Sequence, residues 1–154
     1  MEIERKFLIS QLPENLESYP CRQIEQGYLC TCPVVRIRRQ DDSYYLTYKS
    51  AGMMVREEYN LPLIAESYEH LKPKADGIII TKKRYCIPYQ NYMIELDIFE
   101  GELAPLILAE VEFSTEEEAL KFIPPEWFIK DVTQSYLYHN SYLSQHGFKP
   151  ENES

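Results

Sequence analysis

Polar and charged residues alternate with apolar residues in six segments of this sequence. In the first segment, Glu2, Glu4 and Lys6 are separated by Ile3 and Arg5. In a β-strand, residues two apart share one face, so each segment would present its polar residues together. The other segments carry Arg36 with Arg38, Thr47 with Lys49, Lys82 with Arg84, Glu95 with Asp97, and Glu110 with Glu112. Such a face is typical of a half-solvated sheet, but it would equally line a polar interior.

The signs of these charges segregate from one segment to the next. Surface strands usually mix signs, whereas here basic pairs and acidic pairs occupy different segments. Two carboxylates about 7 Å apart repel each other by roughly 2 kcal/mol at an effective dielectric constant of about 20. If all the segments face one space, the acids require a cation and the bases require an anion. The pattern therefore favours a closed barrel whose polar lumen holds an anion bridged by a metal ion.

The residue types narrow down both ligands. Carboxylates are hard oxygen donors that select Mg²⁺, Mn²⁺ or Ca²⁺ over softer metals. Arginine grips phosphate oxygens in a fork and lysine acts as a point charge, so many bases around one space suit a chain of linked phosphates. The sequence has no glycine-rich phosphate loop, which leaves phosphate binding to side chains. The bases expected to bind phosphate are Lys6, Arg36, Arg38, Lys49, Lys82 and Arg84.

Most of the chain shows the period of two that is typical of strands. We expect strands at about 2–9, 22–30, 34–40, 43–49, 54–61, 78–88, 91–99 and 106–113, and helices at 61–73, 114–125 and 133–146. These elements predict an α+β fold, in which an eight-stranded antiparallel β-barrel forms a tunnel with a charged lumen and a few helices cover its outside. Residues 1–147 would form one domain and residues 148–154 a frayed tail.

Composition excludes several classes of function. The net charge of −9 disfavours general binding to nucleic acid or to an anionic membrane. No run of about 18 apolar residues and no leader-like segment is present, so we expect a cytoplasmic protein that neither spans nor binds a membrane. The four cysteines lack zinc-site spacing and are expected to be buried, reduced thiols. His70, His139 and His146 have no evident catalytic partners, and a structural role is favoured for each.

Several motifs together resemble one known family. "EIERK" resembles the Glu-x-Glu-x-Lys signature of the CYTH superfamily, the triphosphate tunnel metalloenzymes. Further matches follow in the family's order: "QGYL" (26–29), "VRIR" (35–38), "LTYKS" (46–50), "VREEY" (55–59), "TKKRY" (81–85), "IELDIFEGEL" (94–103), "LAEVEF" (108–113) and "DVT" (131–133). One short motif would be weak evidence, whereas this ordered series covers nearly the whole chain.

The resemblance implies a triphosphate bound in the tunnel and dependence on Mg²⁺ or Mn²⁺. It assigns phosphate binding to the six bases above and adds Lys130 near the tunnel mouth. It assigns metal binding to Glu2, Glu4, Glu58, Glu95, Asp97, Glu110 and Glu112. Of all these residues, the catalytic ones are expected to be Glu2, Glu4, Lys6 and Glu112. Asn60 stands where the family often has a second acid, which leaves open whether one or two metal ions bind.

Hydrolysis of inorganic triphosphate is the function that the resemblance favours, with nucleoside triphosphates as weaker substrates. The chain has no added domain and no aromatic pair evidently dedicated to adenine or thiamine. A class IV-type adenylate cyclase and a thiamine triphosphatase are the alternatives within the family. A non-catalytic protein that binds polyphosphate or nucleotide is an alternative of another class. The sequence leaves the oligomeric state open, including a homodimer.

Overall fold

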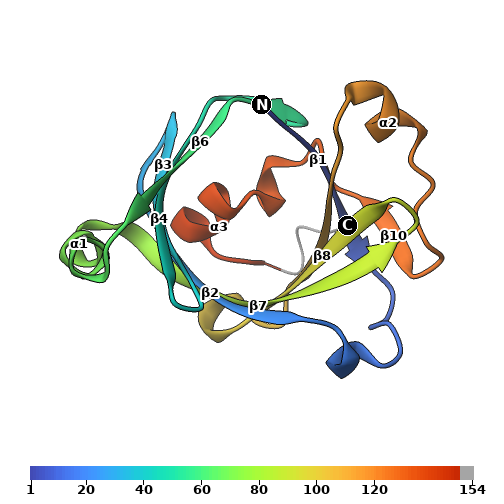
Figure 1. The fold of residues 1–154 in the computed structure, drawn as a ribbon, viewed down its shortest axis with the longest axis horizontal. Helices are drawn as coiled ribbons and strands as arrows, with labels where there is room; N and C mark the ends of the chain where they lie inside the picture. Colours follow the sequence, from blue (N-terminus) through green and yellow to red (C-terminus); the bar gives the residue numbers. More distant parts are fainter. Residues whose placement is uncertain (150–154) are drawn as a thin grey trace.

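A nearly closed barrel of antiparallel strands makes up most of the protein. The computed structural model describes residues 1–149, in which ten strands form one sheet with the order β10-β1-β9-β8-β7-β2-β3-β4-β6, and β5 pairs with β1 (Figure 1). The strands are β1 (Glu2–Ile9), β2 (Cys21–Thr31), β3 (Val34–Gln40), β4 (Ser43–Lys49), β5 (Val55–Arg56), β6 (Glu58–Leu63), β7 (Asp76–Tyr89), β8 (Tyr92–Phe99), β9 (Ile107–Glu112) and β10 (Phe128–Asp131). The predicted fold class is confirmed, with two more strands than expected.

The barrel closes where the expected strand 54–61 divides at Glu57. The residues before Glu57 form β5, which pairs with β1 through Glu2 opposite Arg56, whereas those after it form β6, which pairs with β4. A backbone hydrogen bond fixes Glu57 at this break: the Ser50 N–H donates to the Glu57 carbonyl at 3.0 Å. One segment thereby joins the two ends of the sheet, which explains one of the two additional strands. The other, β10, pairs with β1 and is too short to show an alternating pattern.

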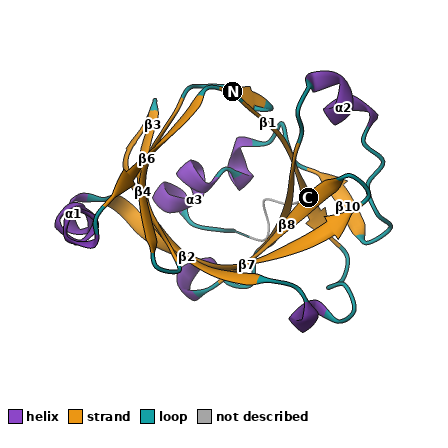
Figure 2. Cartoon of the chain, in the orientation of Figure 1, coloured by secondary structure: helices purple, strands orange, loops and turns teal. Residues whose placement is uncertain are grey.

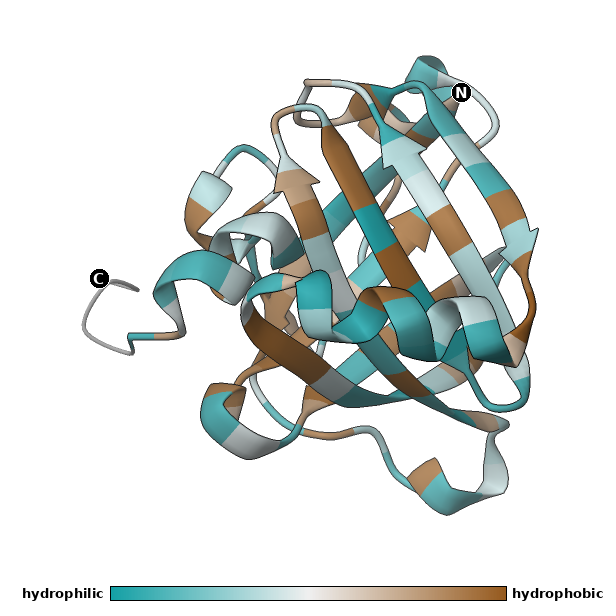
Figure 3. Cartoon of the chain, turned by 90° about the vertical axis from the view of Figure 1, so that its left-hand side faces the viewer, coloured by the Kyte–Doolittle hydropathy of each residue, from teal (hydrophilic) through white to brown (hydrophobic). Residues whose placement is uncertain are grey.

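The outward-facing apolar residues form the first of two hydrophobic clusters. Figure 3 shows hydrophilic and hydrophobic residues alternating along the strands. Ile3, Phe7, Leu96 and Val111 pack outward against Phe122, which follows helix α2 (Glu116–Lys121). Each fully buried side chain of this size stabilises the fold by about 1.5–3 kcal/mol, so this layer supports the wall from outside.

The second cluster lies at one end of the barrel interior. On β7, β8 and β9 the inward-facing positions change along the strand from charged to apolar, ending at Ile80, Phe99 and Leu108, which are all buried. Tyr138 and Leu143 complete this cluster. The charged lumen that the alternation predicts therefore occupies only part of the barrel length, and an apolar layer fills the rest.

The helices take two different positions relative to the barrel. Helices α1 (Ala65–Leu71) and α2 lie outside the ring of strands, as expected, whereas α3 (Asn140–His146) is seen within it (Figure 2). The expected helix over 133–146 was thus wrong in extent and in place. Only the last part of the expected helix is α-helical, and the 3₁₀ turn η4 (Tyr136–Tyr138) precedes it. Leu143 of α3 packs into the apolar layer inside the barrel. Three further 3₁₀ turns are η1 (Leu16–Ser18), η2 (Lys72–Lys74) and η3 (Gly101–Leu103).

Three smaller expectations need correction or comment. Phe148 packs against the second cluster, so the tail does not begin at 148, and residues 150–154 lie outside the described part of the chain. The cysteines are free thiols, but Cys21, Cys30 and Cys32 are exposed rather than buried. In residues 1–149 every helix is too short or too polar to cross a bilayer.

Helix α1 is fastened to the barrel by one buried tyrosine. Tyr68 is fully buried, and its hydroxyl donates a 2.8 Å hydrogen bond to Glu25 Oε1 on β2. Burial would raise the pKa of Glu25, but hydrogen bonds from Lys72 and Tyr68 and the charges of Lys72 and Arg39 hold it below its ordinary value. The ionised Glu25 therefore stabilises the fold above pH 4.5, and this contribution is lost as the pH falls through its folded-state pKa.

We predict that Tyr68→Phe lowers the free energy of unfolding by about 1 kcal/mol at neutral pH, because a hydrogen bond to a largely buried carboxylate is lost. The deficit should narrow in acid, where Glu25 becomes protonated. Denaturant unfolding at neutral pH and below the ordinary pKa of Glu25 measures both effects. Tyr136→Phe, at an exposed tyrosine, is the control. A deficit that is the same at both pH values would contradict the assignment to Glu25.

Candidate active site

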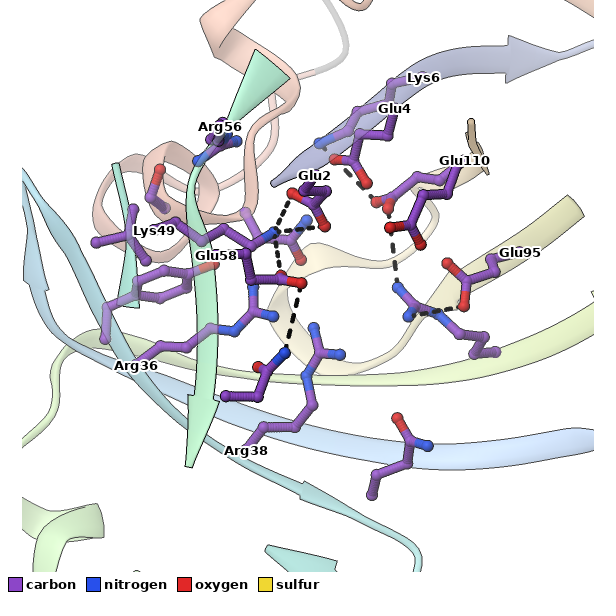
Figure 4. Close-up of a pocket in the computed structure, with 18 of the residues that line it drawn as sticks. Glu2, Glu4, Lys6, Arg36, Arg38, Lys49, Arg56, Glu58, Glu95 and Glu110 are labelled. Atoms are coloured by element: carbon purple, nitrogen blue, oxygen red, sulfur yellow. Dashed lines mark hydrogen bonds and ion pairs between the residues drawn. The ribbon is translucent and has the colours of Figure 1, made fainter. Parts of the chain in front are cut away.

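One cavity of about 210 Å³ occupies the charged part of the barrel interior (Figure 4). Its walls are almost entirely polar. Among residues 1–149, the lining bases are Lys6, Arg36, Arg38, Lys49, Arg56, Lys82 and Arg84, and the lining acids are Glu2, Glu4, Glu58, Glu95, Glu110 and Glu112. Tyr28, Val34, Gln40, Asn60, Asn140 and Ser141 complete the lining. The strands thus bring together the charges that the alternating pattern had selected.

Two of the predicted site residues do not line the cavity. Asp97 is fully buried behind it, with one carboxylate oxygen 2.7 Å from Arg84 Nε and the other 2.7 Å from Lys82 Nζ. Both of its oxygens are therefore engaged by bases, and the expected role as a metal ligand has no support in this geometry. Lys130 is exposed on β10, opposite Leu8 of β1, and lies outside the cavity lining.

Two bases of the cavity wall are poorly compensated by negative charge. Burial, together with the neighbouring charges of Arg36 and Arg84, lowers the pKa of Arg38 to about 9. Burial likewise lowers the pKa of Lys82 to about 7, although Asp97 opposes the shift. Burial destabilises the protonated forms of these bases, and an anion that binds beside them would stabilise those forms again. The cavity is therefore an anion site by charge as well as by residue type.

Arg36 and Arg84 are better compensated than Arg38. Burial would lower the pKa of Arg36, but the charge and hydrogen bond of Tyr28, followed by the charges of Glu58 and Glu2, raise it. Burial also opposes protonation of Arg84, but the charge and hydrogen bonds of Asp97 outweigh this and leave its pKa well above its usual value. Some bases in the wall thus have partners of their own.

The acidic side has the opposite imbalance. The pKa of Glu4 rises to about 8, first through burial and then through the charge of Glu110. The pKa values of Glu95 and Glu112 are also raised, in each case by burial first and then by neighbouring carboxylates, although Arg84 opposes the shift at Glu95. Register explains the crowding, because Glu112 lies opposite Glu4, and Glu110 opposite Glu95.

These acids fit a hard divalent cation. Oxygen donors from β1, β6, β8 and β9 surround one space. Burial and neighbouring carboxylates raise the pKa values of three of them, and a bound cation would favour their ionised forms. Although burial opposes the shift, nearby bases already lower the pKa values of Glu58 and Glu110. Within residues 1–149, no three metal-binding side chains already converge on one point. The carboxylates would therefore have to turn toward a bound ion, and the donor set fits in chemistry while its geometry is not preassembled.

Asn60 occupies the position where a second acid was considered. Its Oδ1 accepts a 2.6 Å hydrogen bond from Thr47 Oγ1, and its Nδ2 lies 3.4 Å from Glu58 Oε1. Glu58 also pairs with Lys49 Nζ at 3.3 Å, as does Glu2 at 3.0 Å. The Asn60 amide therefore helps to orient Glu58, a candidate metal ligand, and adds no negative charge of its own.

Sequence reasoning missed Arg56 and the contribution of α3. Arg56 lies two residues before Glu58 and four before Asn60, so the same alternation that selected the other bases would have placed it on the inward face. Asn140 and Ser141 carry no such signal, because alternation within strands does not reveal where a helix docks. Both residues reach the cavity from the first turn of α3.

Comparison with known proteins gives a consistent result. The model of the CYTH domain family matches residues 1–141. The inorganic triphosphatase of Nitrosomonas europaea is 41% identical over 150 residues, spanning 93% of this chain and 96% of its own length. The inorganic triphosphatase of Acetivibrio thermocellus is 33% identical over 154 residues, spanning 96% of each chain.

A solved structure shares the fold. The crystal structure of the inorganic triphosphatase NE1496 superposes with a TM-score of 0.70 at 37% sequence identity, covering 94% of each chain. The barrel, the inward-facing charges and the match over nearly the whole length agree with one another. This chain belongs to the CYTH domain family.

Proposed function

We propose that this protein hydrolyses inorganic triphosphate with the help of Mg²⁺ or Mn²⁺. The observation that carries the proposal is the cavity itself, where under-compensated bases and under-compensated carboxylates face each other across one enclosed space. A polyanion that carries a divalent cation neutralises both sets of charges. The two relatives named as inorganic triphosphatases support triphosphate as that polyanion.

The bases of the cavity bind and orient the phosphates in this proposal. Lys6, Arg36, Arg38, Lys49, Lys82 and Arg84 keep the roles expected from the sequence, and Arg56 joins them. The exposed position of Lys130 outside the lining argues against a direct contact with bound phosphate. Because arginine forks suit the outer oxygens of a phosphate chain, Arg36 and Arg38 are suited to fix the position of the substrate along β3.

The acids of the cavity are assigned to metal binding and catalysis. Glu2, Glu4, Glu58, Glu95, Glu110 and Glu112 would hold the cation, whereas Asp97 orients Lys82 and Arg84. When bound, a divalent cation neutralises phosphate charge and polarises the bond that breaks. Glu2, Glu4 and Glu112 line the cavity, and Lys6 Nζ lies 3.9 Å from Glu110. We expect these four residues, Glu2, Glu4, Lys6 and Glu112, to align the reacting phosphate.

A substrate panel tests the proposed reaction. We expect phosphate release to be fastest with triphosphate, slower with ATP and thiamine triphosphate, and absent when a chelator removes the metal. Parallel assays with Mg²⁺ and Mn²⁺, with cyclic AMP measured in the ATP samples, compare the alternatives directly. Cyclic AMP formed without phosphate release would replace hydrolysis by cyclisation. Tight binding of triphosphate without any turnover would instead indicate a non-catalytic binder.

Glu4→Gln should abolish turnover while triphosphate still binds. The substitution removes an inward carboxylate from the cation site but leaves the bases in place. Steady-state kinetics and calorimetric titration with triphosphate measure the two properties separately. Glu116→Gln, at an exposed acid on α2, is the matched control and should behave as the wild type. Full activity of Glu4→Gln would refute the assignment of Glu4 to the cation site.

Arg38→Ala should raise KM for triphosphate by about tenfold to a hundredfold, the range expected for a lost charged hydrogen bond of about 1.5–3 kcal/mol. Its neighbour Arg39 is exposed, so Arg39→Ala is the matched control. An unchanged KM would place the phosphates elsewhere.

A further inference from the structure

Three consecutive residues at the start of α3 each contact a base from a different strand. The Tyr138 carbonyl accepts a 3.3 Å hydrogen bond from Lys6 Nζ of β1. His139 Nδ1 lies 3.4 Å from Arg56 Nη2 of β5. Asn140 Oδ1 accepts a 3.1 Å hydrogen bond from Lys82 Nζ of β7. One short segment of chain therefore meets bases from opposite parts of the barrel wall.

Asn140 also reaches a fourth base through Gln26. Gln26 is fully buried, and its Nε2 donates a 3.1 Å hydrogen bond to Asn140 Oδ1. Its Oε1 accepts a 2.8 Å hydrogen bond from Arg38 Nε. The chain of contacts thus runs from Lys82 through Asn140 and Gln26 to Arg38, which links β7 and β3 beneath the cavity.

All of these acceptors are neutral. An arginine can only donate, so His139 Nδ1 must accept from Arg56 and the imidazole is uncharged. Burial, followed by the charges of Lys6 and Arg56, lowers the pKa of His139 to about 3, which agrees with the neutral form. A carbonyl, an amide and an imidazole orient a base without cancelling its charge. A carboxylate in the same place would compete with a bound anion.

The segment is held rigidly enough to position these bases. Tyr138 within the segment and Leu143 after it are buried in the apolar layer of the barrel. Backbone hydrogen bonds of 3.1 Å from the His139 N–H to the Tyr136 carbonyl and 2.9 Å from the Leu143 N–H to the His139 carbonyl fix its conformation. His139 and Asn140 are themselves buried.

We propose that His139 and Asn140, together with Gln26, are positioning residues that orient the cavity bases for the phosphates without adding negative charge to the cavity. This inference rests on the proposed function, because it assumes that the bases bind the phosphates of the substrate. It assigns a role in the reaction to α3, which otherwise closes one end of the barrel. The residues act through Lys82, Arg38 and Arg56 and need not touch the substrate.

Two substitutions at Asn140 separate positioning from simple packing. Asn140→Asp keeps an acceptor for Lys82 and Gln26 but adds a negative charge, so KM for triphosphate should rise by about tenfold or more, with little loss of thermal stability. Asn140→Ala removes the acceptor, and it should lower the unfolding temperature more than Asn140→Asp while raising KM less. Gln145→Ala, at an exposed position on the same helix, is the matched control.

A rescue at His139 provides a second readout. The Asn side chain carries its carbonyl oxygen near the position of the histidine Nδ1, so His139→Asn should retain a KM close to that of the wild type. His139→Ala lacks the acceptor and should raise KM by several-fold, with a smaller change in kcat.

The outcomes distinguish this inference from the proposed function. If wild-type protein does not hydrolyse triphosphate, the proposed function fails, whatever the variants do. If the wild type is active and Asn140→Asp has an unchanged KM, the positioning role is refuted while the function stands. If KM instead rises in proportion to the loss of thermal stability, with Asn140→Ala the more affected of the two substitutions in both properties, the positioning role is refuted. The contribution of α3 would then be packing alone.

Discussion

The barrel encloses many charged side chains, both acids and bases, in one cavity, and the rest of the structure must make this burial possible. Within the described residues, the barrel directs acids from β1, β6, β8 and β9 and bases from β1, β3, β4, β5 and β7 into one cavity. Burying such groups is unfavourable unless each finds a partner of opposite sign. Asp97 with Lys82 and Arg84, and Glu2 with Lys49, satisfy part of this requirement. The charges that remain without such a partner make the cavity suited to a charged ligand.

The apolar layers make this enclosure tolerable. One layer packs the outside of β1, β8 and β9 against α2 and β10, and the other fills one end of the barrel around Tyr138 and Leu143. Neither layer contributes charge, and both are made of side chains that stabilise the fold when buried. The outward faces of the strands and one end of their inward faces therefore stabilise the fold, and the rest of the inward faces is left for ligand binding, which a period of two makes feasible.

Much of this arrangement was readable from the sequence because the side-chain period of a strand is strict. Alternation selected Glu2, Lys6, Arg36 and Arg84 as inward-facing, and the structure brings them to one cavity. The position of a residue along the barrel axis could not be predicted from the sequence. Asp97 has the same alternation as Glu95, yet it is fully buried beyond the cavity, because position along the axis depends on register with neighbouring strands.

Helix placement was also not readable from the sequence. Asn140 reaches the cavity only because Leu143 anchors α3 in the apolar layer, a long-range packing effect that leaves no local signal. Arg56 is different, since the break at Glu57 did not alter the inward parity and a stricter use of alternation would have found it. Arg56 was missed because the alternation rule was not applied to every residue of its segment. The position of α3, in contrast, cannot be predicted from the pattern of any single segment.

The two halves of the cavity differ in how far the protein orders them in advance. Several bases are already held in place: Asp97 and Asn140 fix Lys82, Gln26 fixes Arg38, and Arg56 meets His139. Several acids also pair with bases, Glu2 and Glu58 with Lys49, and Glu95 and Glu110 with Arg84. No three metal-binding side chains, however, converge on one point within residues 1–149. Preorganised donors bind an anion with little loss of conformational freedom, whereas scattered carboxylates must be gathered.

This difference fits a ligand that brings its own cation. A polyphosphate bound to the ordered bases would present a divalent ion to the carboxylates. The ion would compensate the repulsion between Glu4 and Glu110 and between Glu112 and Glu2. A protein that ordered its acids first would have to hold them against that repulsion without a ligand. Bases that are already oriented, and carboxylates that have not converged on one point, therefore suit a ligand that supplies both the anion and the cation.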